Sequence, residues 1–381
     1  MIRRYEKLDI NVPESINEAA PAERLIFFDI ETTGLKAGRS SLYLVGTVTK
    51  EDDGWYLTQL FSENLLDERN VLLGFKEIID NKRKYGHPVL ITYNGDGFDI
   101  PFVRETFREY SMLNPFSNTL SFDLLKVIKP YKKAAGLCDC KLKSVEKLVG
   151  YDREDKYSGG ELIYVYEEYL RLSQILPGGC EDTEANDGLK KSLLRCMLLH
   201  NEEDVCTLPL LMDICSYKIL MEGGFSLKSA SMENGILDLR FELKYPLPRE
   251  LYYEDKDYVI SVSGEDRKLF ELTAVLFEGE LRYFYQDYKN YYYLPAEDMA
   301  VHKSVGEFVD RKNRVKATAS TCYIKKKGLF VPQPEPVFAP CFYKTYKGEK
   351  YGEISAGILT AEDKLKEYAL SVLAKICLIS I

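Results

Sequence analysis

The chain has 381 residues, which is enough for two domains of ordinary size. Hydrophobic residues make up 45% of the sequence and charged residues 29%, the proportions of a globular protein and not of a disordered one. The net charge of −9 argues against a protein that coats nucleic acid nonspecifically. It is compatible with an enzyme that holds one strand end, because divalent metal neutralises the carboxylates of such a site.

Membrane insertion, export and a structural zinc are not expected. Residues 1–7 carry some positive charge, but no apolar stretch follows that would make a secretory signal. No apolar run approaches the ~20 residues that a membrane span needs. The nine cysteines are irregularly spaced and are expected to be reduced thiols in a cytoplasmic protein. Cys138 and Cys140 are close, but no second pair or histidine cluster completes a zinc site.

Strand-like and helix-like stretches alternate in the N-terminal half. Strand character is found in five runs, at residues 25–31, 42–49, 55–61, 88–93 and 121–124. A helical pattern over 70–83 places Val71, Phe75 and Ile78 on one face. Further helices are expected from near residue 99 and from 125 to about 222. Three strands in a meander, followed by strand, helix and strand, predict a mixed α/β sheet.

The sequence pattern changes after residue 222. Two glycines at 223–224 end the helical region, and prolines follow at 246 and 248, so we expect a linker over 223–250. The domains on either side would span 1–222 and 251–381. Short alternating runs, separated by turns such as 326–328, predict an antiparallel β-rich C-terminal domain. A final helix is expected over about 361–378, with Thr360 as its N-cap.

The first acidic motif lies at the end of an apolar strand. Asp29 and Glu31 are two residues apart, so their side chains point to one side of the strand while Phe28 and Ile30 point to the other. Their Cα atoms are expected to be about 6.6 Å apart, close enough to share a metal site. Burial of such a pair is costly without a cation or strong donors. The alternative is that both acids lie in solvent at the strand end.

The second motif is a turn that leads into a helix, from Asn94 to Pro101. Its two glycines allow a sharp turn, and Asp99 falls at the start of the helix. We prefer Asp99 to Asp96 as a functional carboxylate, because Asp96 lies at the loop tip. The alternative is that Asp99 is only an N-cap and that Asn94 only completes the turn.

The third motif places His200 and Asp204 one helical turn apart, so both share a face of the helix. Apolar residues expected on the same face aim both groups at the sheet: Leu189, Leu193 and Met197. Glu202 and Glu203 are displaced around the helix and are interpreted as surface acids. A kink or a new helix is expected just past Asp204, because Pro209 lacks an amide.

Together these motifs resemble those of the DEDD superfamily of 3′–5′ exonucleases, with Asp29 and Glu31 in the first motif, Asp99 in the second and Asp204 in the third. The resemblance covers about residues 20–222. It implies a ribonuclease-H-like fold, a mixed five-stranded sheet with flanking helices, followed here by the β-rich domain and its helix. The His-Asn-x-x-Asp-Val form at 200–205, with stretches 121–125 and 142–150, is similar to the bacterial YprB-like branch.

This resemblance implies two divalent cations, Mg²⁺ or Mn²⁺, in the active site. Asp29 would bridge them, Glu31 and Asp204 would complete one site, and Asp99 would support the other. Oxygen ligands without sulfur suit these metals better than zinc. His200 would be the general base, although the chain departs from the main subgroups, which carry His-x4-Asp or Tyr-x3-Asp in the third motif. Here histidine stands in the tyrosine position.

Several further residues are candidates for binding substrate or metal. The residues just past the first acids are placed to hold a terminal nucleotide: Thr32, Thr33 and Leu35. Asn94 is a further substrate-binding candidate. Phe98 is expected either to stack beside a base or to lie in the core. Asp123 is a secondary candidate carboxylate, for which capping of the next helix is the preferred interpretation. A lysine-rich stretch over 126–147 either holds the phosphate backbone or is a solvated face.

The sequence and its resemblance to this superfamily together imply a two-metal 3′–5′ exonuclease, a hydrolase acting on single-stranded DNA or RNA ends. Two alternatives are a catalytically silent nucleic-acid-binding or scaffold protein, and a phosphodiesterase acting on short oligonucleotides. The sequence does not distinguish DNA from RNA as the substrate, and it identifies no protein partner. In the C-terminal half, seven of the eleven residues over 283–293 are aromatic. They are expected to fill a small β core, with single-strand binding by stacking as the alternative.

Overall fold

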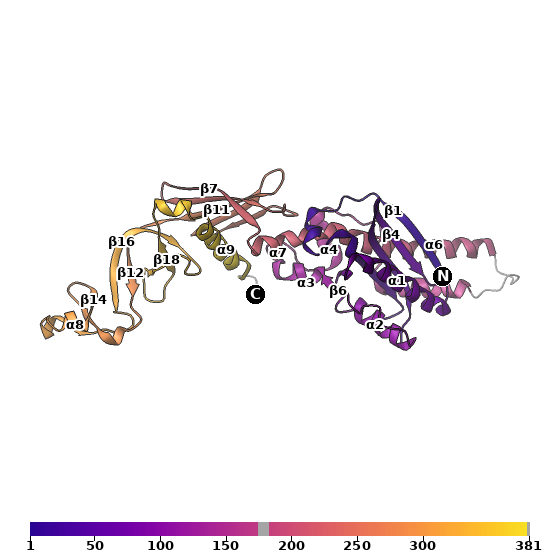
Figure 1. Ribbon diagram of the computed structural model, residues 1–381, viewed down its shortest axis with the longest axis horizontal. Coiled ribbons are helices and arrows are strands. Elements are labelled where there is room, and N and C mark those ends of the chain that lie inside the picture. The colour runs from indigo at the N-terminus through magenta and orange to yellow at the C-terminus, as the bar shows by residue number, and fades with distance from the viewer. Residues whose placement is uncertain (174–182, 379–381) are drawn as a thin grey trace. The chain divides into compact units, whose positions relative to one another are not determined.

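A computed structural model describes residues 1–173 and 183–378 of the chain. The chain divides into two compact units, Met1–Lys218 and Ile219–Ile381, and each is described here by itself (Figure 1). Within the described residues, no helix is long and apolar enough to cross a membrane.

The first unit is built on a mixed sheet with strand order β1-β4-β3-β2-β5-β6. The pairs β1–β4, β4–β3 and β3–β2 are antiparallel, whereas β5 and β6 run parallel to β2. The five predicted strands are all present: β2 (Leu25–Thr32), β3 (Leu42–Glu51), β4 (Gly54–Phe61), β5 (Val89–Thr92) and β6 (Leu120–Asp123). This confirms the ribonuclease-H-like architecture of a mixed sheet with flanking helices.

A sixth strand, β1 (Ile2–Leu8), was not predicted. Its residues are mostly charged and largely exposed, so the hydrophobic pattern of a strand is absent. The strand forms because its backbone pairs with the edge of β4, from Ile2 opposite Phe61 to Leu8 opposite Trp55. Charged side chains are typical of such edge strands, since they discourage pairing with a further chain.

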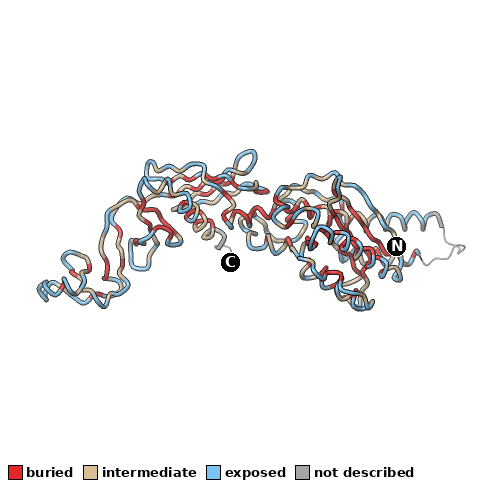
Figure 2. Tube along the Cα trace, in the orientation of Figure 1, coloured by how far each residue is buried: buried red, intermediate tan, exposed pale blue. Residues whose placement is uncertain are grey.

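Helices cover both faces of this sheet. On one face, Phe28 and Ile30 of β2 pack against α1 (Glu68–Lys82) and α2 (Asp99–Glu109). On the other, Tyr43 of β3 and Phe61 of β4 pack against α5 (Gly159–Ser173) and α6 (Thr183–Leu211). The central strands of the sheet are therefore largely buried, as the buried stretches of the first unit in Figure 2 indicate. The alternation predicted for β2 is confirmed, since its even-numbered residues face α1 and its acids face the opposite side.

Short helices complete the first unit: α3 (Leu124–Ile128) and α4 (Leu142–Glu146). A further short helix, α7 (Cys215–Met221), includes the residue at which the first unit ends. Pro209 lies inside α6, which continues to Leu211, so the helix ends later than expected from the proline. Leu193 and Met197 pack on the sheet as predicted, but Leu189 is 45% exposed and does not. The apolar stripe that leads to His200 is therefore one turn shorter than expected.

The second unit begins with a five-stranded antiparallel sheet, in the order β7-β8-β11-β10-β9. Its strands are β7 (Phe225–Glu233), β8 (Ile236–Leu243), β9 (Leu251–Glu254), β10 (Tyr258–Ser263) and β11 (Leu269–Val275). The segment 223–250 is thus mainly a β-hairpin and not the linker that was expected. Asn234 and Gly235 make its tight turn with φ of 52° and 75°, and an Asn-Gly pair between alternating residues is a hairpin signal that outweighs the nearby prolines.

A closed barrel follows, formed by β12 (Phe277–Phe284), β16 (Tyr323–Pro332), β18 (Lys350–Glu353) and β17 (Cys341–Tyr343). The turn expected at 326–328 is wrong, because Lys326, Lys327 and Gly328 lie inside β16 and pair with β12. Ion pairs compensate the lysine charges on this strand, as between Lys326 and Glu353. The β-rich character predicted for this region is confirmed.

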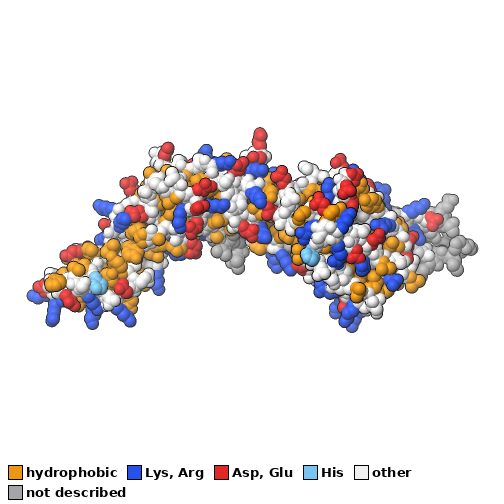
Figure 3. Space-filling model, viewed as in Figure 1, with side chains coloured by type: hydrophobic (Ala, Val, Ile, Leu, Met, Phe, Trp, Pro, Cys, Tyr) orange, Lys and Arg blue, Asp and Glu red, His pale blue; other side chains and the backbone are white. Residues whose placement is uncertain are grey.

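Three shorter strands form a separate sheet, β14 (Met299–His302), β13 (Tyr291–Leu294) and β15 (Val315–Lys316), next to α8 (Lys303–Gly306). Tyrosines pack there on a small core of Ala300, Ala317 and Cys322, in agreement with the core interpretation of the aromatic segment. Basic and hydrophobic side chains gather on the surface around α8 (Figure 3), where Phe308 is 92% exposed. The final helix, α9 (Glu362–Leu378), begins after Thr360, which ends a 3-10 turn and does not cap it.

Candidate active site

The two acids of the first motif lie on the face of β2 that α6 covers. Asp29 is opposite Gly46 of β3, and Glu31 is opposite Leu44. Asn201 of α6 is fully buried here, and its Nδ2 donates a hydrogen bond to Asp29 Oδ2 at 3.2 Å. The close approach of α6 thus orients the first carboxylate.

Gly46 makes this approach possible. A Cβ added at residue 46 would lie 2.1 Å from Asn201 Oδ1, far inside van der Waals contact. Gln59 holds the same amide in place, since its Nε2 donates to Asn201 Oδ1 at 3.1 Å and to the Leu198 carbonyl at 2.8 Å. No local sequence pattern predicts the roles of Asn201 and Gln59, because their contact depends on how closely α6 approaches β3.

We therefore expect Gly46→Ala to destabilise the first unit by about 1–3 kcal/mol, the usual cost of overpacking a buried site. Gly160→Ala is the control, because a Cβ at this helical position meets no atom within 4 Å. It is expected to leave stability unchanged or slightly raised. Urea unfolding followed by fluorescence of the single tryptophan, Trp55 of β4, measures both. Equal stabilities of the two variants would contradict this account.

Asp99, from the second motif, is the first residue of α2 and is 5% exposed. The preceding turn depends on Asn94, whose φ of 66° lies in the left-handed region that asparagine tolerates. Asp96 of the same turn is not part of the acidic cluster and forms an ion pair with Lys126 at 2.5 Å. The helix start thus buries one carboxylate of the turn and leaves the other on the surface.

Asp123 is buried and acts as a helix cap, in line with the preferred interpretation. Its Oδ1 accepts hydrogen bonds from the amides of Leu125 at 3.0 Å and Asn94 at 2.8 Å. Its Oδ2 accepts from the amide of Asp96 at 3.3 Å. Asp123 therefore ties the turn of the second motif to the start of α3.

The third motif brings His200 and Asp204 of α6 to the acids of β2. His200 Nε2 lies 3.7 Å from Glu31 Oε1 and 3.5 Å from Asp204 Oδ2. One donor atom from each of these three residues lies within 4.8 Å of the others, a spacing that could hold a metal ion. His200 and Glu31 are 4% and 7% exposed, so this group is largely shielded from water.

A loop over 153–155 contacts the same turn of α6, a contact that no local sequence motif predicts. Arg153 forms an ion pair with Asp204, and Asp155 Oδ2 lies 2.7 Å from His200 Nδ1. Glu203 is not a surface acid as expected. It is 4% exposed, and its carboxylate accepts the amides of Glu154 at 2.7 Å and Asp155 at 2.9 Å. Glu202 is only partly exposed and pairs with Arg4.

Arg153 is anchored on its other side by Glu146 of α4. Its Nε and one terminal nitrogen donate to the two carboxylate oxygens of Glu146 at 2.6 Å and 2.5 Å, a bidentate pair. Thr207 of α6 also donates to Glu146, at 2.9 Å. The guanidinium is thereby fixed with its remaining nitrogen against Asp204.

Burial and mutual repulsion disfavour negative charge in this cluster. Burial raises the pKa of Asp29 and of Glu31 well above their ordinary values, and the charges of Asp204 and Asp99 raise both further. Burial also raises the pKa of Asp99 to about 7, although the backbone amides of Asp99 and Ile30 oppose the rise. The four acidic residues of the three motifs are therefore close enough to influence one another.

The donor set fits divalent metal. Among the described residues, Arg153 pairs with Asp204, but no lysine or arginine pairs with Asp29, Glu31 or Asp99. The cluster thus holds more carboxylates than the surrounding side-chain cations neutralise. Hard, closely spaced oxygen donors with one imidazole nitrogen nearby suit Mg²⁺ or Mn²⁺.

The residues expected to bind substrate differ in how accessible they are. Thr32 Oγ1 donates to the Gly34 carbonyl at 2.8 Å, and Thr33 Oγ1 accepts the Ser41 amide at 2.9 Å, so both hydroxyls have local roles. Leu35 is 84% exposed. Asn94 is exposed as well, while Phe98 is half-buried against the core formed with α2.

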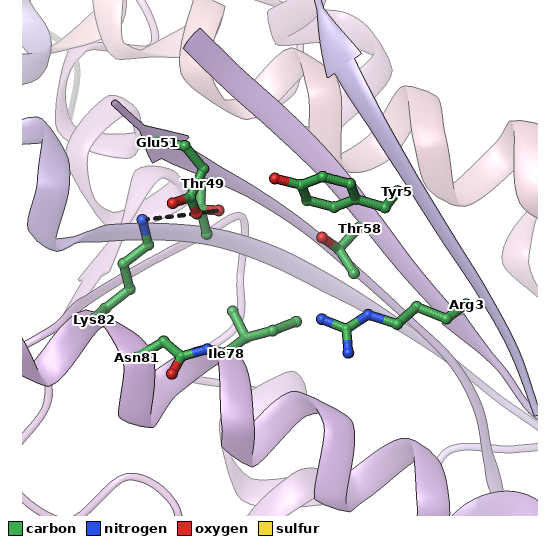
Figure 4. A pocket seen from close by; sticks show the side chains of 8 residues that line it. All are labelled: Arg3, Tyr5, Thr49, Glu51, Thr58, Ile78, Asn81 and Lys82. Carbon is green, nitrogen blue, oxygen red and sulfur yellow. Dashed lines mark hydrogen bonds and ion pairs between the residues drawn. The ribbon is translucent and has the colours of Figure 1, made fainter. Parts of the chain in front are cut away.

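A cavity of about 390 Å³ lies elsewhere in the first unit, between α1 and strands β1, β3 and β4 (Figure 4). Arg3, Glu51 and Lys82 are its charged residues, and Lys82 Nζ lies 3.3 Å from Glu51 Oε1. None of the lining residues belongs to the carboxylate cluster. The cavity is therefore separate from the candidate site.

Three comparisons place the chain among known proteins. The family model described as the RNase_H superfamily matches residues 26–216. No curated protein matches the chain. Among solved structures, the family B DNA polymerase from the hyperthermophilic archaeon Pyrobaculum calidifontis is similar, with 15% identity and a TM-score of 0.31. The match covers 70% of this chain and 35% of the polymerase chain, so the similarity spans about a third of the polymerase.

Proposed function

This chain belongs to the RNase_H superfamily, and on that premise we propose that it is a metal-dependent 3′–5′ exonuclease of the DEDD kind, from the YprB-like branch. The proposed substrate is the 3′ end of single-stranded DNA or RNA, and the proposed catalytic domain spans 1–222. The observation that carries the proposal is the convergence of acids from three separate motifs beside one histidine: Asp29, Glu31, Asp99 and Asp204 with His200.

The four carboxylates are proposed to hold two Mg²⁺ or Mn²⁺ ions. Bound in this way, the ions would polarise the scissile phosphodiester and stabilise the charge that develops on it. Asn201 orients Asp29 through its hydrogen bond, and Arg153 holds Asp204. Both contacts fix ligand oxygens before metal arrives, which reduces the cost of organising the site.

His200 is proposed to accept the proton of the attacking water at Nε2, the nitrogen that faces Glu31 and Asp204. The water oxygen bonds to phosphorus, the bond from phosphorus to the preceding 3′ oxygen breaks, and a nucleoside 5′-monophosphate leaves. Thr32, Thr33 and Leu35 follow directly after Glu31 and are proposed to hold the terminal nucleotide. Of these, Leu35 presents the most exposed apolar surface to a base.

Two other functions use the same fold. A silent scaffold or binding protein would not require acids at all four metal-ligand positions, so their presence favours catalysis. A phosphodiesterase of short oligonucleotides would use the same carboxylates, because these recognise the phosphodiester and not the length of the strand.

The proposal is tested with 5′-labelled single-stranded DNA and RNA oligonucleotides and Mn²⁺. We expect a ladder that shortens from the 3′ end, is abolished by EDTA and falls by about 10³-fold or more in Asp29→Ala, because the site loses a metal ligand. Asp96→Asn is the matched control, since this acid pairs with Lys126 on the surface. Binding without cleavage under every metal would instead indicate the silent protein, and cleavage of dinucleotides alone would indicate the short-substrate enzyme.

A further inference from the structure

His200 is faced by carboxylates at both ring nitrogens, but at different distances. Nδ1 is 2.7 Å from Asp155 Oδ2, which is a hydrogen-bond distance. Nε2 is 3.7 Å from Glu31 and 3.5 Å from Asp204, which is too long for good hydrogen bonds. An ionised carboxylate only accepts hydrogen bonds, so the neutral ring carries its proton on Nδ1. Nε2 then keeps a lone pair directed at the acidic cluster.

Asp155 is itself firmly held. Its side chain is 2% exposed, and Oδ1 accepts the amide of Tyr157 at 3.0 Å. Lys143 Nζ lies 3.4 Å from Oδ2. Glu203, three residues after His200 on α6, accepts the backbone amides of Glu154 and Asp155. The helix that carries the imidazole therefore also holds the backbone of its partner, which locks their relative position.

We propose that Asp155 is a positioning residue, which holds His200 as the Nδ1–H tautomer and so leaves Nε2 free to accept the proton of the attacking water. This inference rests on the proposed function and extends it to a residue outside the three acidic motifs. When water transfers its proton to Nε2, the ring becomes an imidazolium, and its Nδ1–H bond to Asp155 becomes charge-assisted. Asp155 stays ionised throughout, and the leaving 3′ oxygen takes a proton from solvent.

Asp155→Asn tests this role without a change in side-chain shape. The Tyr157 amide requires an acceptor, so the oxygen of the introduced amide stays on that side. Its NH₂ group then turns to His200 Nδ1, where it donates, and the ring proton moves to Nε2. We expect kcat at saturating Mn²⁺ to fall by about 10²- to 10⁴-fold, the usual contribution of a general base, with KM little changed.

The tautomer is measured directly by ¹⁵N NMR of the histidine rings in the full-length, metal-free protein at alkaline pH, where imidazole is neutral. The chain has three histidines, and His200→Gln identifies the signals of His200. We expect a protonated Nδ1 and an unprotonated Nε2 in the wild type, and the reverse in Asp155→Asn. Glu154→Gln is the matched control, because it removes the same charge from an exposed neighbouring side chain. It is expected to keep both the tautomer and kcat.

The inference would be overturned by a wild-type His200 protonated on Nε2, by a tautomer unchanged in Asp155→Asn, or by a reversed tautomer with unchanged kcat. A variant that only needs more Mn²⁺ and recovers full kcat at saturation would also overturn it, because His200 would then serve to hold metal. The NMR measurement needs no turnover. A protein that cleaves no substrate but shows the expected tautomers would contradict the proposed nuclease function. It would still support the proposal that Asp155 sets the tautomer of His200.

Discussion

Glu31→Gln is expected to reduce nuclease activity by about 10³-fold or more and, without metal, to make the protein more stable. Activity falls because a proposed metal ligand loses its charge. Stability rises because burial, and then the charges of Asp204 and Asp99, raise the pKa of Glu31 well above its ordinary value. A carboxyl whose pKa is raised on folding lowers the free energy of unfolding at any pH above its pKa in the unfolded chain. Neutral pH lies above that value, so removal of the carboxyl relieves the penalty.

Metal should reverse the order of stability. At a Mn²⁺ concentration about 100 times its Kd, the wild type should gain about 2.7 kcal/mol, while Glu31→Gln, which binds metal more weakly, should gain less. Urea unfolding in EDTA and in Mn²⁺, followed by Trp55 fluorescence, measures both effects. Asp96→Asn is again the control, and it should respond to metal like the wild type. A Glu31→Gln protein that is less stable than the wild type in EDTA would contradict the charge-repulsion account.

Arg153→Met is expected to destabilise the first unit by about 3–5 kcal/mol, because it leaves the carboxylate of Glu146 buried without its cation. The Arg153 and Glu146 side chains are 7% and 1% exposed, and Thr207 alone cannot neutralise the charge that is left. The same unfolding measurement in EDTA reports the loss. By contrast, Lys76→Ala breaks an exposed ion pair with Asp80 on α1, so it should cost no more than about 1 kcal/mol.

The double variant Arg153→Met with Glu146→Leu separates lost charge balance from lost packing. If an uncompensated buried carboxylate causes the loss, removal of that carboxylate should restore most of the stability. If the double variant is as unstable as Arg153→Met, the guanidinium contributes mainly through packing, and the electrostatic explanation is wrong.

Local patterns in the sequence were sufficient for five of the six strands of the sheet and for part of the site. The alternation of β2 puts Phe28 and Ile30 into the core with α1 and turns Asp29 and Glu31 to the other face. Helical spacing alone brings His200 and Asp204 to one side of α6. These features depend on residues two to four positions apart, and backbone geometry relates such neighbours in a fixed way. Asn234-Gly235 is also a local signal, and because it forms a tight turn, the segment expected to be a linker is a hairpin.

Contacts between segments far apart in the sequence are not fixed by local backbone geometry. β1 has no apolar alternation and forms because β4 offers an edge, and Asn201 reaches Asp29 only where Gly46 leaves room. His200 and Asp155 are 45 residues apart in the chain. Glu203, by its position on the helix, was expected to be exposed, yet a loop covers it.

The sequence by itself therefore determined the succession of strands along the chain around the acidic motifs, the shared side of Asp29 and Glu31 on β2, and the helical turn that joins the histidine to the last acid. Only the tertiary structure decided which side chains contact the acids and the histidine, namely Asn201, Arg153 and Asp155. It also decided that Glu203 holds the loop that carries Asp155. The reason is physical. Secondary structure repeats at short sequence intervals, whereas the partner of a buried polar group is whichever donor or acceptor the folded chain brings within hydrogen-bond distance.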